Sequence, residues 1–115
     1  MNSLELNIIN YLKSNHFGKS NSIHFIKLAS KFDLNERDLR SMIADLVTDN
    51  HLPIGSGSNG YYWIDGEAER KAAHEQLLKR IKKLSKRAKG IRLSGININI
   101  EKPIEKYNQD RLVGV

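Results

Sequence analysis

The chain has 115 residues, of which 39% are hydrophobic and 28% charged, and its formal net charge is +6 at pH 7. This size and composition indicate one globular domain, and the absence of cysteine excludes a disulfide framework and a thiolate metal site. No apolar run approaches the ~20 residues that span a bilayer, and the start MNSLELNIINYLKSN lacks the pattern of a signal peptide, so we expect a cytoplasmic protein with no membrane partner.

Two short amphipathic helices are predicted in the first third of the chain. The first begins at the candidate N-cap Ser3 and ends near Asn15. Its apolar residues recur at helical spacing on one face: Leu4, Ile8, Ile9 and Leu12. The second runs from about His24 to Lys31, after a very short strand around Ile23. It is expected to bury three side chains: Phe25, Leu28 and Phe32.

A third helix is predicted from the candidate N-cap Asn35 to about Asp49, with Asn50 as its stop. Asp38 occupies the third helical position, where a carboxylate can bond back to the amide of the cap. The apolar residues of this helix form a single stripe at spacings of three and four: Leu39, Met42, Ile43, Leu46 and Val47. The stripe predicts one buried face and one exposed face.

A hairpin should follow, with strands at residues 52–56 and 61–64. Its flexible turn is formed by four small or polar residues: Gly57, Ser58, Asn59 and Gly60. Because Tyr61, Tyr62 and Trp63 alternate across the second strand, we expect one side to be buried and the other partly exposed. Core packing is the favoured role for most of these aromatic side chains.

A fourth helix is predicted from residue 66 to residue 89, with Asp65 as its cap and Gly90 as its stop. Residues 1–65 hold six basic and seven acidic side chains, whereas residues 66–90 hold nine and three. Seven cations lie within eleven residues without an acid: Lys79, Arg80, Lys82, Lys83, Lys86, Arg87 and Lys89. Nearly all of the excess positive charge therefore lies on this one helix.

The same helix has apolar residues at heptad spacing: Leu77, Ile81, Leu84, Ala88 and Ile91. We expect a homodimer through Leu77, Ile81, Leu84 and Ala88. Packing against the first helix, contact with anionic lipid and a simply solvated charged face are the alternatives. The chain is thus divided into a body (1–65), a basic amphipathic helix (66–90) and a tail (91–115). In the tail, Ile96, Ile98 and Ile100 alternate with polar residues, which is typical of a strand.

No motif of an enzyme is present. The Gly-Lys-Ser at residues 18–20 lacks the earlier glycine of a phosphate-binding loop, because that position is Lys13. The four histidines are scattered without a carboxylate at ligand spacing: His16, His24, His51 and His74. We therefore expect neither enzymatic activity nor a cofactor or metal.

The strings LNERDLRSMIADL and PIGSGSNGYYWI resemble the winged helix-turn-helix DNA-binding proteins of bacteria, and the small phage and prophage type in particular. The resemblance covers residues 4–65. It implies a mainly α fold with a small β-hairpin (α+β): a winged helix-turn-helix, here followed by a long basic helix and a short tail. The family's function, binding of double-stranded DNA, is the function that the resemblance implies.

Carried over to this sequence, the third helix is the recognition helix. Arg37 and Arg40 would read bases in the major groove, and Asn35 or Ser41 would contact bases or phosphate. The alternative is that both arginines are solvated or paired with acids of their own helix: Glu36, Asp38 or Asp45. The turn, which is the wing of the family, has no cation, but its polar residues could touch phosphates: Ser56, Ser58 and Asn59.

Two functions are consistent with these patterns. The first is a sequence-specific DNA-binding protein, a phage or prophage regulator or an accessory factor of replication or recombination. In it, the basic helix would supply phosphate affinity through six cations: Lys79, Arg80, Lys82, Lys83, Lys86 and Arg87. The second is a non-enzymatic adaptor or inhibitor of a host nucleoprotein built on a winged-helix frame, with a host or phage protein as partner. Its tail could add a strand to the sheet of that partner.

Overall fold

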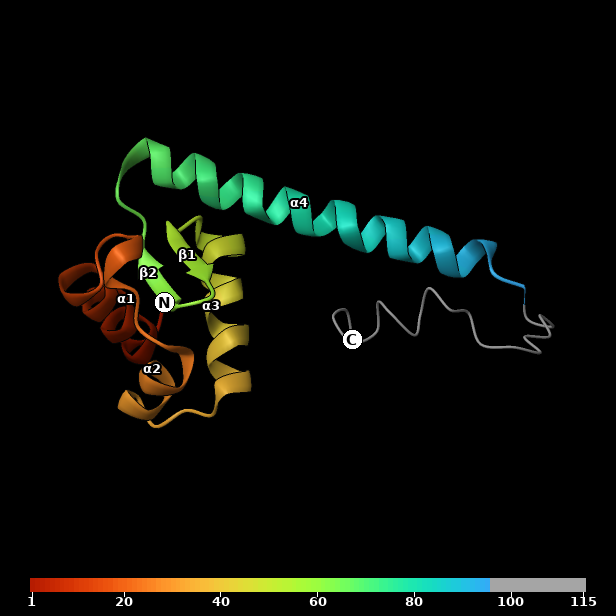
Figure 1. Cartoon of the computed structure of the whole chain (residues 1–115). Helices are drawn as coiled ribbons and strands as arrows, with labels where there is room; N and C mark the ends of the chain where they lie inside the picture. The colour runs from red at the N-terminus through yellow and green to blue at the C-terminus, as the bar shows by residue number, and fades with distance from the viewer. Residues whose placement is uncertain (96–115) are drawn as a thin grey trace. The chain divides into compact units, whose positions relative to one another are not determined.

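The computed structural model describes residues 1–95 and is mainly helical, with one two-stranded antiparallel hairpin. The α+β class expected from the sequence is confirmed. The elements in chain order are α1 (Ser3–Asn15), the 3-10 turn η1 (Lys19–Asn21), α2 (Phe25–Lys31), α3 (Glu36–Asn50), β1 (Ile54–Gly57), β2 (Gly60–Trp63) and α4 (Gly66–Leu93), as labelled in Figure 1. Residues 1–80 form one compact unit, and residues 81–95 belong to a second unit.

The first helix is capped by Asn2, so the predicted cap at Ser3 is wrong by one residue. The side-chain oxygen of Asn2 accepts the N–H of Glu5 at 2.8 Å, and the Glu5 carboxylate accepts the N–H of Asn2 at 2.9 Å. This reciprocal pair satisfies two backbone donors at once. Ser3 as the cap would place Leu6 at the third position, where no acceptor exists. The predicted end at Asn15 is confirmed.

The cap of α3 is Asn35, as predicted: its side-chain oxygen accepts the N–H of Asp38 at 2.7 Å. The carboxylate of Asp38 accepts the side-chain amide of Asn35 at 3.0 Å, so the two side chains hold each other. The helix includes Asn50, the expected stop, and so ends one residue later than predicted. His51 ends it in the left-handed conformation (φ 56°), and its N–H donates to Val47 at 3.1 Å.

The core lies where α1, α2 and α3 meet the hairpin, which Figure 1 shows between α1 and α3. Nine buried residues form it: Ile8, Leu12, Ile23, Leu28, Ala29, Leu39, Ile43, Ile54 and Tyr61. Phe25 and Phe32, predicted to be buried, are only half-buried against this cluster. The apolar periods of the three helices therefore point to one shared core.

The hairpin is shorter than predicted: Ile54 pairs with Trp63, Gly57 pairs with Gly60, and only residues 58–59 form the turn. The short strand expected around Ile23 is an isolated bridge to β2, in which Ile23 and Tyr61 exchange two backbone hydrogen bonds of 2.9 Å. At this bridge Gly60 has a φ of 117°, and a Cβ there would collide with the carbonyl oxygen of Ile23. Only glycine allows this approach.

Tyr61 and Tyr62 are both buried, so the expected alternation of burial along β2 is wrong. They lie on opposite faces of the strand, but both faces are covered. The ring of Tyr62 lies against Gly55, where a Cβ would collide with it. Burial raises the pKa of both phenols. The packing of Tyr62 therefore requires the absence of a side chain at residue 55.

The helix α4 begins at Gly66, directly after the predicted cap Asp65, and Glu69 holds its start. The carboxylate of Glu69 accepts the backbone N–H of Asp65 at 2.8 Å and of Lys19 at 3.0 Å. The predicted stop at Gly90 is wrong, because the helix continues to Leu93. Nothing crowds Gly90, and a glycine inside a helix costs only about 1 kcal/mol. The strand predicted at Ile96–Ile100 lies outside the described residues.

Candidate functional site

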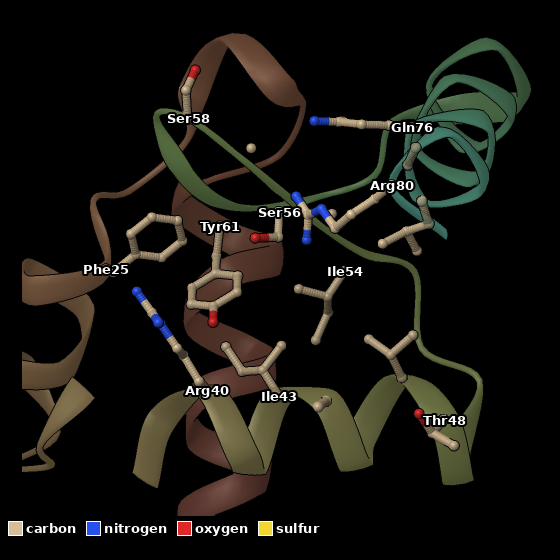
Figure 2. A pocket seen from close by; sticks show the side chains of 16 residues that line it. Phe25, Arg40, Ile43, Thr48, Ile54, Ser56, Ser58, Tyr61, Gln76 and Arg80 are labelled. Carbon is tan, nitrogen blue, oxygen red and sulfur yellow. The ribbon is translucent and has the colours of Figure 1, made fainter. Parts of the chain in front are cut away.

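An open groove of about 820 Å³ lies within residues 1–80, between α3, the hairpin and the first half of α4 (Figure 2). The hairpin contributes Ile54, Ser56 and Tyr61 to its lining, and Ser58 lies at its edge. One wall belongs to α3: Arg40, Ile43, Ala44, Val47 and Thr48. The opposite wall belongs to α4: Ala73, Gln76, Leu77 and Arg80. Segments distant in sequence are therefore brought to one concave surface.

The wall on α3 arises from a second stripe beside the core stripe. Residues 40, 44, 47 and 48 recur at spacings of four, three and one, so they lie along the flank of the helix next to its buried face. Val47 is half-buried, whereas Arg40, Ala44 and Thr48 are exposed. The helix thus packs one face into the core and presents its flank to the groove.

Arg40 lies at the end of the groove nearest α2, and two contacts fix its direction. Its guanidinium is 2.6 Å from the carboxylate of Glu36 and 5.6 Å from the ring centroid of Phe25. Phe25 in turn meets Tyr61 edge to face at 4.9 Å. The Arg40 side chain is still 61% exposed. It is therefore oriented by its neighbours and remains accessible to a ligand.

Arg80 is the second cation of the groove. Figure 2 shows its side chain extending from α4 toward Ser56 of β1, with Gln76 one turn earlier on the same helix. Among the sixteen residues that line the groove in this part of the chain, two are arginine and none is aspartate or glutamate. The interior of the groove is lined by four branched aliphatic side chains, Ile43, Val47, Ile54 and Leu77, beside Phe25 and two alanines. The groove combines an apolar interior with two cations and several hydroxyls.

The predicted site residues separate into two groups. Arg40, Ser56, Ser58 and Arg80 line the groove together. Three others are exposed but do not line it: Arg37, Ser41 and Asn59. The side chain of Asn35 is exposed, and both of its polar atoms bond to Asp38 in the helix cap. Contact between Asn35 and DNA would compete with these bonds.

The remaining cations lie on α4, and each is exposed: Lys79, Lys82, Lys83, Lys86, Arg87 and Lys89. Leu77, which the sequence placed in a dimer seam, is 53% exposed and lines the groove. Other lining residues were not anticipated from sequence: Phe25, Thr48, Gln76 and the glycine backbone of β1. The stripe at residues 40, 44 and 47 could have revealed the α3 wall, but no local pattern marks Gln76.

Within residues 1–95, no three histidine or acidic side chains are grouped so that they could hold a metal ion. No helix in this part of the chain is long and apolar enough to cross a bilayer.

Comparisons with protein-family models, curated proteins and solved structures found no significant match.

Proposed function

We propose that this protein is a winged-helix module that binds double-stranded DNA through α3, the hairpin and the cations of α4. The observation behind the proposal is the groove that joins Arg40, Ser56 and Arg80 without an acidic residue in its lining. The element order supports the winged-helix part, since two helices, a third helix and a hairpin follow one another. Ile23, in the segment that joins α1 to α2, also pairs with Tyr61 of β2 and so adds a short strand to the hairpin.

In this proposal α3 is the reading helix. Arg37 and Ser41 lie exposed on its outer side and would face the base edges of the major groove. Arginine binds the O6 and N7 atoms of guanine with two hydrogen bonds. Arg40, already directed into the groove, would exchange the carboxylate of Glu36 for a phosphate or a guanine edge.

The groove would hold the sugar-phosphate strand beside α3. Arg40 and Arg80 lie on its two walls, and the hydroxyls of Ser56 and Ser58 can donate to phosphate oxygens between them. The turn has no cation, and residues 1–65 have a slight excess of acids. Most of the phosphate affinity would therefore come from the nine basic residues of 66–90. A role as a phage or prophage regulator, or in replication or recombination, is part of the same proposal.

Duplex binding measured by fluorescence anisotropy across salt concentrations tests the proposal. We expect Arg40→Ala to weaken binding about tenfold and to relax discrimination among sequences selected from a random pool. Arg70→Ala is the matched control, because Arg70 pairs with Glu67 on α4 and does not line the groove. It removes the same charge and should cause a smaller loss. Wild-type binding by the Arg37→Ala/Arg40→Ala variant would refute the assignment.

A second function is favoured by the apolar part of the groove, which a phosphate backbone leaves unused. Val47 and Leu77 are accessible there, and Leu77 is 53% exposed. A protein-binding adaptor or inhibitor would use these side chains together with Arg40 and Arg80. Failure to bind any duplex at ~50 mM salt, where basic proteins bind DNA without sequence preference, would favour this second function.

A further inference from the structure

Residues 81–93 of α4 present an apolar stripe that is exposed in the described part of the chain. Ile81, Leu84 and Ile91 are 60%, 53% and 70% exposed. With Ala88 they repeat at spacings of three, four and three, which keeps them on one face of the helix. Large apolar side chains at this spacing are typical of a helix that packs against another helix.

The charges of this segment are sorted by residue type around the helix. At about 100° per residue, the four lysines lie on the side opposite the stripe: Lys82, Lys83, Lys86 and Lys89. Two arginines border the stripe, Arg87 along one edge and Arg92 along the other. All six cations are exposed. The segment therefore has a lysine face and an arginine-bordered apolar face.

These two faces suit different ligands. Both cations bind phosphate, but the two arginines flank an apolar surface, and the planar guanidinium is favoured at protein interfaces, where it binds carboxylates with two parallel hydrogen bonds. We propose that the stripe Ile81, Leu84, Ala88 and Ile91 docks an acidic amphipathic helix of another protein, with Arg87 and Arg92 paired to its carboxylates. The lysine face stays free for nucleic acid, so this inference goes beyond DNA binding and does not depend on it.

The heptad spacing by itself predicted a homodimer, but charge argues against a second copy of this chain as the occupant. The segment from residue 79 to residue 95 contains no aspartate or glutamate. In a parallel pair, Arg87 of one copy would face Arg92 of the other, and in neither orientation would this segment bring a carboxylate to either arginine. Like charges at these positions oppose association. An acidic partner turns the same contacts into attraction.

The probe for this docking is a synthetic helical peptide with leucine and isoleucine at heptad spacing and glutamate beside them. A matched peptide has lysine in place of each glutamate. With the full chain, we expect the glutamate peptide to bind at least tenfold more tightly than the lysine peptide in an anisotropy titration. The Ile81→Asn/Leu84→Asn variant should lose at least tenfold in affinity for the glutamate peptide. The Lys82→Gln/Lys86→Gln variant alters the opposite face and should keep it.

The charge-reversed variant Arg87→Glu/Arg92→Glu keeps the apolar stripe and should instead prefer the lysine peptide. This variant tests the inference even if circular dichroism shows that the asparagine variant has lost helix content. Equal binding of the two peptides by the wild type would overturn the proposal. So would a dimer in light scattering that the Ile81→Asn/Leu84→Asn variant abolishes, since the occupant would be a second copy. Stripe-dependent binding to phosphatidylglycerol vesicles, with no affinity for the glutamate peptide, would assign the stripe to a lipid surface.

Discussion

The guanidinium of Arg40 is bound to the carboxylate of Glu36, one turn earlier on α3 and 2.6 Å away. Both groups are solvent-accessible, so the pair contributes little to stability. The ion pair matters instead for the proposed contact between Arg40 and DNA. Glu36 holds Arg40 beside Phe25, and it also places a negative charge next to the cation that the proposed DNA contact requires.

Glu36→Gln should therefore raise duplex affinity a few-fold at low salt, because it removes a charge that repels phosphate and releases Arg40. The free energy of unfolding should change by no more than about 0.5 kcal/mol. Glu67→Gln is the control, since it removes a carboxylate paired with Arg70 that does not line the groove. Anisotropy at several salt concentrations measures the effect, and equal affinities of the two variants would argue against Arg40 as a DNA contact.

Gly60→Ala should destabilise the unit formed by residues 1–80 by about 3 kcal/mol, the sum of a strained left-handed backbone and a steric collision. The new Cβ would meet the backbone of Ile23, which cannot move without breaking its two hydrogen bonds to Tyr61. Urea unfolding measures the loss. Gly57→Ala lies at the other end of the same turn, where a Cβ would make only an ordinary contact with Lys19 at 3.8 Å, and should be far milder.

Gly90→Ala distinguishes the predicted end of α4 from the observed one. Because the helix passes through this residue and nothing lies within 4 Å of a Cβ there, alanine should stabilise the helix by about 1 kcal/mol. Far-ultraviolet circular dichroism should show equal or greater helix content. A loss of helix content would instead indicate a left-handed glycine cap at this position, as the sequence suggested.

The stability of residues 1–80 should depend on pH through Glu69. Its carboxylate accepts the N–H of Asp65 and of Lys19, and these bonds lower the pKa of the carboxyl in the folded state. The contribution is complete above the ordinary glutamate pKa of about 4.3 and is lost as the pH falls through the lowered folded-state pKa. Glu69→Gln should thus destabilise the protein at pH 7 and have less effect at pH 3.

Urea midpoints of the wild type and Glu69→Gln at the two pH values measure this difference. Glu75→Gln removes the same charge from an exposed position on the same helix and should leave the pH dependence as it is in the wild type. A difference between the wild type and Glu69→Gln that stays constant from pH 7 to pH 3 would contradict the role of the carboxylate in holding α4 to residue 19.

Local signals in the sequence predicted much of the fold. The periods of α1 and α3, the Asn35 cap and the position of the hairpin all follow from interactions within a few residues, so the structure agrees with them. The start of α1 and the end of α4 were predicted at the wrong residues because neighbouring residues favour other helix ends. Asn2 completes a capping box that Ser3 cannot, and Gly90 lies among strong helix formers that carry α4 to Leu93.

The helices, the hairpin, the cationic segment and the apolar heptad stripe could all be predicted from the sequence, because spacing along a helix or strand sets which side chains share a face. Packing between elements brings Arg40, Ser56 and Arg80 to one groove and buries both tyrosines of β2. The same packing lets the carboxylate of Glu69 accept the backbone N–H of Lys19, fifty residues away. These contacts depend on how the helices and strands pack against one another. The spacing of residues within one helix or strand does not show which side chains of another element will lie beside it.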